Sequence, residues 1–446
     1  MASHHTKEKE HMKCIEICKS SELNGSVRIQ GSKNSSLALM SAACLADGTS
    51  VIENVPDISD VRILIDIMKD MGTVAFFCNA NSVYIDPRGI EAPFISASKT
   101  YKVRPSYYFI GALLQKHKKI KLGYPGGDRI GKRPIDQHIK GLQQMGARFE
   151  FHEGFYTVTA DELNGCEIYF DVITGGATLN LIMAATKAKG TTLLYNAAKD
   201  PEVVDTSIML NSMGARISGA GTNTIRIEGV SEISGCRYQA IPDRLIAGTY
   251  LITGGVTGGC VKVENVIPEH LMPLIQKLRE TGMDFCINDS DITAFSDGKI
   301  RPARITADKF PSFETDFQQP VTAMLLKAKG RSVVTDKVYP QRNRHCGQLA
   351  KMGADIEWNE GTAYINGGRK LEGTMVRADD IRAGTCLVLA GLFAEGRTVI
   401  TGVEHIERGF MDIIGDLSGI GARICFHEDK NDILYEKTSG YIAVEV

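Results

Sequence analysis

The chain has 446 residues, enough for two or three domains with sizeable cores. Its 43% hydrophobic and 23% charged residues are ordinary for a soluble globular protein, and no apolar run reaches membrane-spanning length. The net charge of −2 argues against a nucleic-acid-binding surface, so a cationic site would have to be local. The chain has eleven dispersed cysteines, no CxxC pair and no signal peptide. This argues against a zinc cluster and favours the reducing cytoplasm.

Residues 1–12 contain no hydrophobic segment, and we expect a disordered or artificially added arm there. A first strand is predicted over residues 13–30. It precedes the first complete repeat described below, so we expect it to close the second of two domains.

Six amphipathic helices along the chain end at a similar glycine, and a β-type run follows each one. Glycine can end a helix at positive φ. The glycines lie 74, 68, 68, 71 and 68 residues apart: Gly72, Gly146, Gly214, Gly282, Gly353 and Gly421. A repeat of this length is too long for a solenoid unit and indicates a βα subdomain used six times.

The second repeat differs from the others in length. From the start of the apolar strand to the closing glycine, five repeats take 23 to 25 residues, whereas the second takes 29 from His117 to Gly146. The additional residues fall within the Gly-rich, basic segment 123–133. This is either a tolerated surface insertion or an acquired functional loop, and its composition favours the loop.

The six units split most simply into two similar α/β domains of three units each. The first would comprise residues 33–241, and the second residues 13–32 plus 242–446. The chain would then cross between domains near Ser32 and near Pro242. A cleft between two domains is a favoured place for a small-molecule site.

Several basic residues fall in turns rather than on helix faces. Any one of them is most simply a surface charge. Their recurrence in equivalent turns of different repeats favours a site for carboxylate or phosphate, which arginine binds with paired hydrogen bonds. The residues are Lys33, Arg104, Arg133, Arg342, Arg344, Arg382 and Arg408.

Two carboxylates are candidates for chemistry. Asp316 precedes an apolar helix and is either a helix cap or a catalytic group. Asp128 lies in the inserted segment with no capping pattern after it, which favours a functional role. No Walker A motif, dinucleotide fingerprint or Ser-His-Asp spacing is present.

These stretches together resemble the UDP-N-acetylglucosamine 1-carboxyvinyltransferase family of enolpyruvyl transferases, over essentially residues 13–440. The resemblance is carried by Gly31-Ser32-Lys33-Asn34, Pro125-Gly126-Gly127, Gly131-Lys132-Arg133-Pro134-Ile135-Asp136, Asn196-Ala197-Ala198-Lys199-Asp200-Pro201-Glu202, Thr315-Asp316 with Gln318-Gln319, Asp380-Ile381-Arg382-Ala383 and His405-Ile406-Glu407-Arg408-Gly409. It implies a two-domain inside-out α/β barrel of six βαβαββ units, three per domain, around buried helices.

The resemblance also implies a reaction without metal or cofactor. The enolpyruvyl group of phosphoenolpyruvate is added to the sugar 3′-hydroxyl of UDP-N-acetylglucosamine, and phosphate leaves a tetrahedral intermediate. This serves peptidoglycan precursor synthesis and needs no nucleic acid or membrane partner. The oligomeric state stays open.

The resemblance assigns residue roles as well. Lys33, Arg133 and Arg408 hold the phosphate, with Lys33 and Arg408 also counted as catalytic, and Arg342 and Arg382 hold the carboxylate. Asn34 and Asp316 contact the sugar, with Asp316 as the candidate base. The uridine nucleotide is expected against Arg104, Arg133, Pro134, Ile135, Asp136, His138, Thr174, Gly175, Gly176 and Val338.

Some positions depart from the family pattern. Asp128 stands where most members have the cysteine that acts as general acid in a mobile loop, here residues 124–134. Fosfomycin alkylates that cysteine, so the aspartate implies resistance. Thr174-Gly175-Gly176, Ile246 and Arg344 also depart and leave the exact nucleotide acceptor open.

Two alternatives stay open. The chain could use another uridine nucleotide, or it could be a catalytically silent regulatory copy. A shikimate-pathway synthase of the same fold is disfavoured by the segment Arg133–Asp136.

Overall fold

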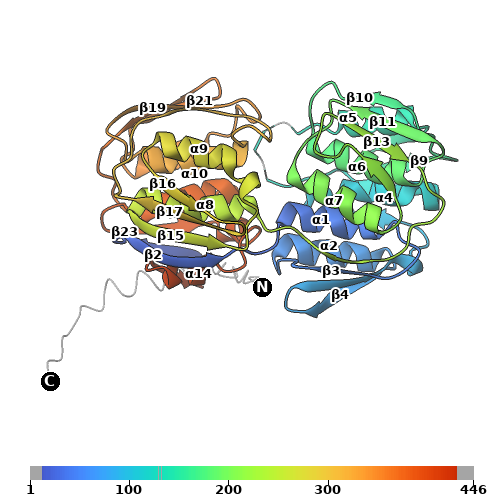
Figure 1. The fold of residues 1–446 in the computed structure, drawn as a ribbon, viewed down its shortest axis with the longest axis horizontal. Helices are drawn as coiled ribbons and strands as arrows, with labels where there is room; N and C mark the ends of the chain where they lie inside the picture. Colours follow the sequence, from blue (N-terminus) through green and yellow to red (C-terminus); the bar gives the residue numbers. More distant parts are fainter. Residues whose placement is uncertain (1–12, 129, 132, 429–446) are drawn as a thin grey trace, which may run out of the picture.

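The computed structural model describes residues 13–128, 130–131 and 133–428, which form two lobes side by side (Figure 1). Each lobe has its own cluster of buried apolar side chains. One cluster takes residues between Leu37 and Ala240, and the other takes residues from Ile15 to Ile29 together with residues from Leu245 to Ile424.

Six four-stranded sheets are present in the described residues, each with one parallel and two antiparallel pairs. The sheets of the first lobe are β14(Arg237–Gln239)-β3(Ser50–Glu53)-β5(Ser82–Asp86)-β4(Val74–Asn79), β6(Phe94–Ile95)-β7(Lys119–Gly123)-β9(Phe155–Thr159)-β8(Arg148–His152) and β10(Glu167–Tyr169)-β11(Thr191–Tyr195)-β13(Thr224–Glu228)-β12(Arg216–Ser218). Those of the second are β16(Asp284–Ile287)-β17(Asp291–Ser296)-β15(Gly259–Glu264)-β2(Leu23–Arg28), β18(Arg304–Ala307)-β19(Gly330–Asp336)-β21(Thr362–Gly367)-β20(Ile356–Asn359) and β22(Met375–Arg377)-β23(Arg397–Thr401)-β1(Cys14–Cys18)-β24(Arg423–His427).

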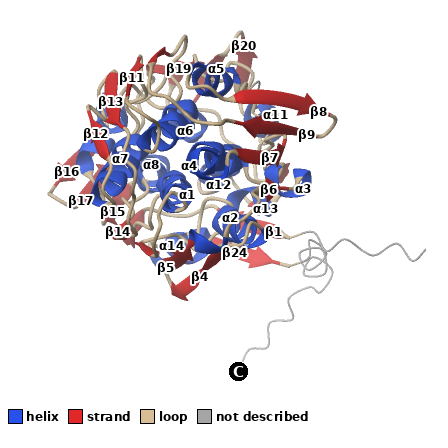
Figure 2. Cartoon of the chain, turned by 90° about the vertical axis from the view of Figure 1, so that its right-hand side faces the viewer, coloured by secondary structure: helices blue, strands red, loops and turns tan. Residues whose placement is uncertain are grey.

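The sheets surround six inner helices, which are buried along most of their length (Figure 2). These helices are α1(Lys33–Ala43), α4(Tyr108–His117), α6(Gly175–Thr186), α8(Arg244–Thr257), α10(Gln318–Leu325) and α12(Ile381–Gly391). Helices enclosed by sheets are the inside-out arrangement that the family resemblance implied, so the predicted fold class is confirmed. None of the described helices is long and apolar enough to span a membrane.

The six predicted helix-ending glycines all have φ between 91° and 108°. Each one follows a helix of the second set and precedes a strand, as the repeat predicted. This set comprises α2(Ser59–Asp70), α5(Asp136–Gln144), α7(Pro201–Ser212), α9(Met272–Glu280), α11(Arg344–Lys351) and α14(Ile413–Gly419). Short helical turns complete the fold: α3(Ala97–Thr100), α13(Val403–Ile406), η1(Pro87–Gly89), η2(Arg104–Tyr107), η3(Pro268–His270) and η4(Thr315–Phe317).

The predicted single strand over residues 13–30 is wrong, because the segment forms two strands in different sheets. β1 lies between β23 and β24, whereas β2 pairs with β15. The polar residues 19–22 interrupt the strand, and there the backbone N–H of Ser20 donates to the carbonyl of Leu392. The chain therefore turns out of one sheet and into the next.

The chain passes between the lobes along two paired segments. Gly31 and Pro242 form an isolated antiparallel bridge. Ser32 N–H donates to the carbonyl of Ile241 at 2.7 Å, and Asp243 N–H donates to the carbonyl of Gln30 at 2.9 Å. The two crossing segments are therefore hydrogen-bonded to each other.

Replacing Gly72 by alanine should destabilise the protein more than the same change at Gly214. Both residues have positive φ, so both variants should lose about 1–3 kcal/mol through backbone strain. A Cβ at Gly72 would also lie 2.3 Å from the carbonyl oxygen of Gly89, whereas at Gly214 the nearest atom lies 3.8 Å away. Urea unfolding followed by circular dichroism measures the difference, and equal losses would contradict the expectation.

Candidate functional site

The N-terminal ends of inner helices from both lobes meet at the junction between the lobes. Side chains next to these ends line two adjoining cavities there. Ser32, Thr174, Asp243 and Asp380 cap α1, α6, α8 and α12 by accepting hydrogen bonds from backbone N–H groups. A helix N-terminus carries partial positive charge, so the junction favours anions.

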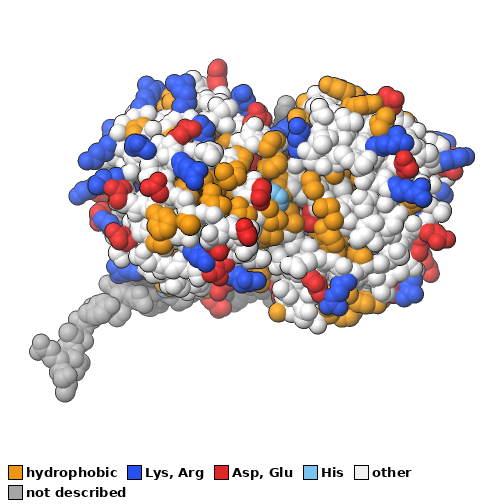
Figure 3. Space-filling view, viewed as in Figure 1, with side chains coloured by type: hydrophobic (Ala, Val, Ile, Leu, Met, Phe, Trp, Pro, Cys, Tyr) orange, Lys and Arg blue, Asp and Glu red, His pale blue; other side chains and the backbone are white. Residues whose placement is uncertain are grey.

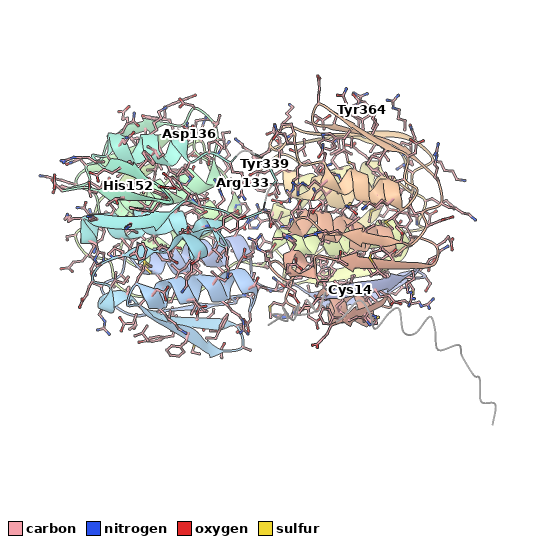
Figure 4. The ribbon with its side chains drawn as sticks, turned by 180° about the vertical axis from the view of Figure 1, so that it is seen from behind. Cys14, Arg133, Asp136, His152, Tyr339 and Tyr364 are labelled. Atoms are coloured by element: carbon pink, nitrogen blue, oxygen red, sulfur yellow. The ribbon has the colours of Figure 1, made fainter. Side chains whose placement is uncertain are left out.

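The smaller cavity, of about 150 Å³, gathers the predicted cationic residues. Lys33, Arg133, Arg342, Arg382 and Arg408 all line it, from both lobes. Asn34, Arg104, Asp128 and Asp316 line it as well. Figure 4 shows Arg133 beside Tyr339, which comes from the other lobe and also lines this cavity.

Asp316 lies between two buried arginines. Its Oδ1 accepts from Arg342 Nη1 at 3.3 Å and from Arg382 Nε at 3.1 Å, while Arg342 Nη2 donates to Asp380 at 2.7 Å. Burial would raise the pKa of Asp316, but the charges of Arg382 and Arg342 outweigh burial and hold the pKa well below its usual range.

Two arginine donors here are buried without a partner among the described residues, Arg342 Nε and Arg382 Nη1. A buried unpaired donor is costly. The pair is therefore suited to accept a further anion.

Asp60, a residue that sequence reasoning missed, positions two of the cations. Lys33 Nζ lies 3.3 Å from Asp60 Oδ2, and Arg408 Nε lies 2.8 Å from Asp60 Oδ1. The Asp60 side chain is only 3% exposed. In the sequence it looks like an ordinary first-turn acidic residue of α2, so no local signal marked it.

Asp128 contacts Arg408 and His405 across the junction. Arg408 Nη1 donates to Asp128 Oδ1, and His405 Nδ1 lies 3.1 Å from the same oxygen. Burial acts to raise the pKa of Asp128, but the hydrogen bond from His405 and the charge of Arg408 lower it to about 2. The same hydrogen bond raises the pKa of His405. Asp128 is therefore ionised in this state.

The larger cavity, of about 520 Å³, adjoins the first and gathers most of the residues predicted for the nucleotide. Those that line it are Asn34, Arg104, Arg133, Pro134, Asp136, His138, Thr174, Gly175, Gly176, Asp316 and Val338. Ile135 does not line it, because its side chain packs against the core of the first lobe. A nucleotide contact by Ile135 therefore stays a prediction.

Figure 3 shows the lysine and arginine side chains of one face dispersed among acidic ones, without a continuous basic surface. The concentrated positive charge is instead the set of cations in the small cavity. This agrees with a local anion site and with the low net charge.

His138 is a buried member of the larger cavity. Its Nδ1 lies 3.0 Å from Asn180 Nδ2, and its ring packs edge-on against Tyr107. Burial and then the charge of Arg104 lower its pKa to about 3, so the imidazole is neutral.

A buried charge cluster at the edge of the larger cavity was not predicted. Arg244 Nη1 donates to Glu202 at 2.9 Å, and its Nε and Nη2 donate to the two oxygens of Glu314 at 2.8 and 2.6 Å. Glu202 belongs to the first lobe and Arg244 to the second, so the cluster bridges the lobes. Burial, followed by the charge of Glu202, raises the pKa of nearby Asp200 to about 7. In the sequence, the signal that could have marked this cluster was the adjacent pair Asp243-Arg244, at the point where the chain crosses between the lobes.

Two of the departures from the family pattern lie outside both cavities. Ile246 lines a separate cavity of about 550 Å³ beside the crossing segments. Arg344 is exposed, 3.9 Å from Asp379. A bearing of these two residues on the acceptor therefore stays a prediction. Thr174, Gly175 and Gly176 do line the larger cavity, and a Cβ on Gly175 would make only ordinary contact with Asp200 at 3.6 Å.

A family model described as EPSP synthase (3-phosphoshikimate 1-carboxyvinyltransferase) matches residues 17–417. The chain belongs to this family. UDP-N-acetylglucosamine 1-carboxyvinyltransferase 2 of Bacillus anthracis is 46% identical over 402 residues, 90% of this chain and 94% of that protein. The protein of that name from Listeria monocytogenes serovar 1/2a is 46% identical over 403 residues, 90% and 95% of the two chains. The resemblance inferred from the motifs is confirmed.

The fold of these transferases is shared with a solved structure. The enolpyruvyl transferase NikO from Streptomyces tendae has a TM-score of 0.85 at 24% identity, covering 93% of this chain and 99% of that one.

Histidine titrations should separate His138 from His405. By NMR, His138 should stay neutral from pH 5 to 8, and His405 should titrate above the usual value of about 6.5. In Asp128→Asn, the titration of His405 should move down. Because folding lowers the pKa of His138, the folded state binds fewer protons, and stability should fall below about pH 6.5 by up to about 1.4 kcal/mol per pH unit. A His138 signal that titrates near pH 6.5 would contradict this assignment.

Proposed function

We propose that this protein transfers the enolpyruvyl group of phosphoenolpyruvate to the 3′-hydroxyl of UDP-N-acetylglucosamine and releases phosphate. The supporting observation is the group of six cationic side chains from both lobes around a small cavity that adjoins a larger one. The 46% identity to relatives named for this activity supports the choice of acceptor. The reaction would supply peptidoglycan precursor synthesis in the cytoplasm.

In this proposal, phosphoenolpyruvate is held by its two anionic groups. Lys33, Arg133 and Arg408 take the phosphate, and Arg342 and Arg382 take the carboxylate through donors that lack partners in the described residues. Preorganised donors of this kind stabilise developing charge in a transition state. No residue of the small cavity is required to hold a metal or cofactor.

Asp316 is proposed as the base for the sugar hydroxyl. A carboxylate paired with two arginines is a weak base. When the substrate carboxylate binds the unpartnered donors of Arg342 and Arg382, its negative charge lies next to Asp316 and shares the charge of the same two arginines. The proton affinity of Asp316 then rises, so substrate binding and activation of the base are linked through these arginines.

Asp128 and His405 are proposed to supply the proton to the methylene carbon of phosphoenolpyruvate. The hydroxyl oxygen bonds to the adjacent carbon as its proton passes to Asp316, and a tetrahedral intermediate forms. Since Asp128 is ionised beside His405, the imidazolium is the proton reservoir and Asp128 the group next to the substrate. Loss of a methyl proton and departure of phosphate then restore the enol ether.

We propose that the two lobes are the domains predicted from the sequence, residues 33–241 and residues 13–32 plus 242–446. The two domains would close around the anionic substrates. Residues 124–134 are proposed as the mobile loop over the site, with residues 129 and 132 outside the described part.

Another uridine nucleotide stays the alternative acceptor, since Thr174, Gly175 and Gly176 depart from the family pattern. A silent regulatory copy is disfavoured by the assembled cationic residues.

Arginine variants and an acceptor panel test the proposal. Phosphate release from phosphoenolpyruvate should depend on UDP-N-acetylglucosamine and be absent with UMP. Arg382→Ala should reduce kcat/KM by at least about 100-fold, because it removes a charge-assisted contact in a desolvated site. Arg344→Ala is the matched control, since Arg344 is exposed and lies outside both cavities. Equal activity in the two variants would sink the proposal.

Asp128 should make the wild-type protein resistant to fosfomycin, because a carboxylate is a much weaker nucleophile than a thiolate. Asp128→Cys should keep activity and become sensitive to time-dependent inactivation. Its pH profile should also change, since the ordinary pKa values of Asp and Cys differ by about 4–5 units. Inactivation of the wild-type protein at another residue, or full activity of Asp128→Ala, would rule Asp128 out as the loop acid.

A further inference from the structure

The sheet that joins the two ends of the described chain carries three metal-binding side chains on one face. In this sheet β1 and β24 are antiparallel, with Glu16 opposite Cys425 and Cys14 opposite His427. Side chains alternate between the two faces of a strand. Ile15 and Ile17 point into the second core, so Glu16, Cys425 and His427 share the opposite face.

The three side chains lie close enough to share an ion. His427 Nε2 is 3.3 Å from Glu16 Oε2 and 3.3 Å from Cys425 Sγ, and the potential ligand atoms of all three residues lie within 4.8 Å of one another. In tetrahedral zinc sites the bonds are about 2.0–2.3 Å long, which places neighbouring ligand atoms about 3.3–3.6 Å apart. Both distances to His427 Nε2 meet this spacing.

We propose that Glu16, Cys425 and His427 bind a divalent cation of the zinc class, with water in the fourth position. The ligand set of one thiol, one imidazole and one carboxylate suits zinc or cobalt better than magnesium or calcium, which prefer oxygen. On binding, the thiol of Cys425 loses its proton to solvent and the thiolate bonds to the metal.

Arg397 supports the carboxylate of this site. Its Nη1 lies 3.2 Å from each oxygen of Glu16. One oxygen can keep this hydrogen bond while the other turns to the metal, as partners outside the ligand set commonly do. The arginine charge lowers metal affinity, so we expect a site of moderate strength.

The site is separate from the proposed chemistry. None of its three ligands lines either cavity at the junction. Figure 4 shows Cys14, on the same strand as Glu16, well away from Arg133 and Tyr339. β24 is an edge strand of its sheet, so a bound metal would fasten it to β1 and stabilise the second lobe.

The absence of a CxxC pair led us to expect no zinc cluster. That expectation rested on spacing along the chain, whereas these ligands come from opposite ends of the described sequence and meet only through strand pairing. Among the described residues, Glu16, Cys425 and His427 form the group of three His, Cys, Asp or Glu side chains whose ligand atoms lie close enough together to hold a metal ion.

Cobalt binding to the chelator-treated full-length protein tests the proposal. The wild type should bind one Co²⁺ with a thiolate-to-cobalt charge-transfer band in the near ultraviolet, and Zn²⁺ should displace it. Cys425→Ser should lose the band, and Cys425→Ser and His427→Gln should weaken zinc binding by at least about tenfold. Cys18→Ser is the matched control, since Cys18 lies on the same face of β1 but outside the cluster, and it should behave as wild type.

Thermal unfolding gives a second measurement. Zinc should raise the Tm of the wild type and of Cys18→Ser but not that of Cys425→Ser. A missing cobalt band, a band that persists in Cys425→Ser, or equal zinc binding by Cys425→Ser and Cys18→Ser overturns the proposal. Chelator treatment should leave phosphate release unchanged, so failure of the metal site is distinguishable from failure of the proposed function.

Discussion

The enclosure of six helices by sheets is the constraint on which the rest of the molecule depends. A helix that is surrounded along its length can meet solvent or ligand only at its ends. In both lobes the ends next to the junction are N-terminal, where backbone N–H groups lack partners within the helix. Polar side chains therefore gather at these ends: Lys33 on α1, Arg244 on α8 and Arg382 on α12. The fold concentrates positive potential at one place without a large net charge.

The cations at the junction are balanced by carboxylates from the protein itself. Asp60 pairs with Lys33 and Arg408, and Asp316 pairs with Arg342 and Arg382. An anionic ligand therefore competes with an internal carboxylate rather than entering a bare positive cavity. Binding and rearrangement of these pairs are linked, which makes the protonation of Asp128 and Asp316 depend on what occupies the cavity.

Local sequence patterns were sufficient to predict the repeated units and the α/β fold class of this molecule. Glycines such as Gly72 and Gly421 could be predicted to end helices because this role depends only on local backbone geometry. The basic residues in turns could be predicted because they lie in recognisable motifs. Partners contributed by distant segments were not visible. Asp60, and the contact of Arg244 with Glu202 across the lobes, depend on tertiary packing that spacing does not encode. Ile135, Ile246 and Arg344 show the converse, because a position within or near a motif does not determine which way its side chain points.

The place of β1 and β2 has a consequence for synthesis on the ribosome. These strands are made long before their partners, because β2 pairs with β15, and β1 is flanked by β23 and β24 from the end of the described chain. The first lobe can close when β14 pairs with β3, whereas β1 waits for more than 370 further residues. At about 5–20 residues per second, this leaves an unpaired strand waiting for roughly 20–80 s. Nascent chains therefore expose the unpaired, partly apolar strand β1 until β23 and β24 have been made, which makes this segment a candidate binding site for a ribosome-associated chaperone.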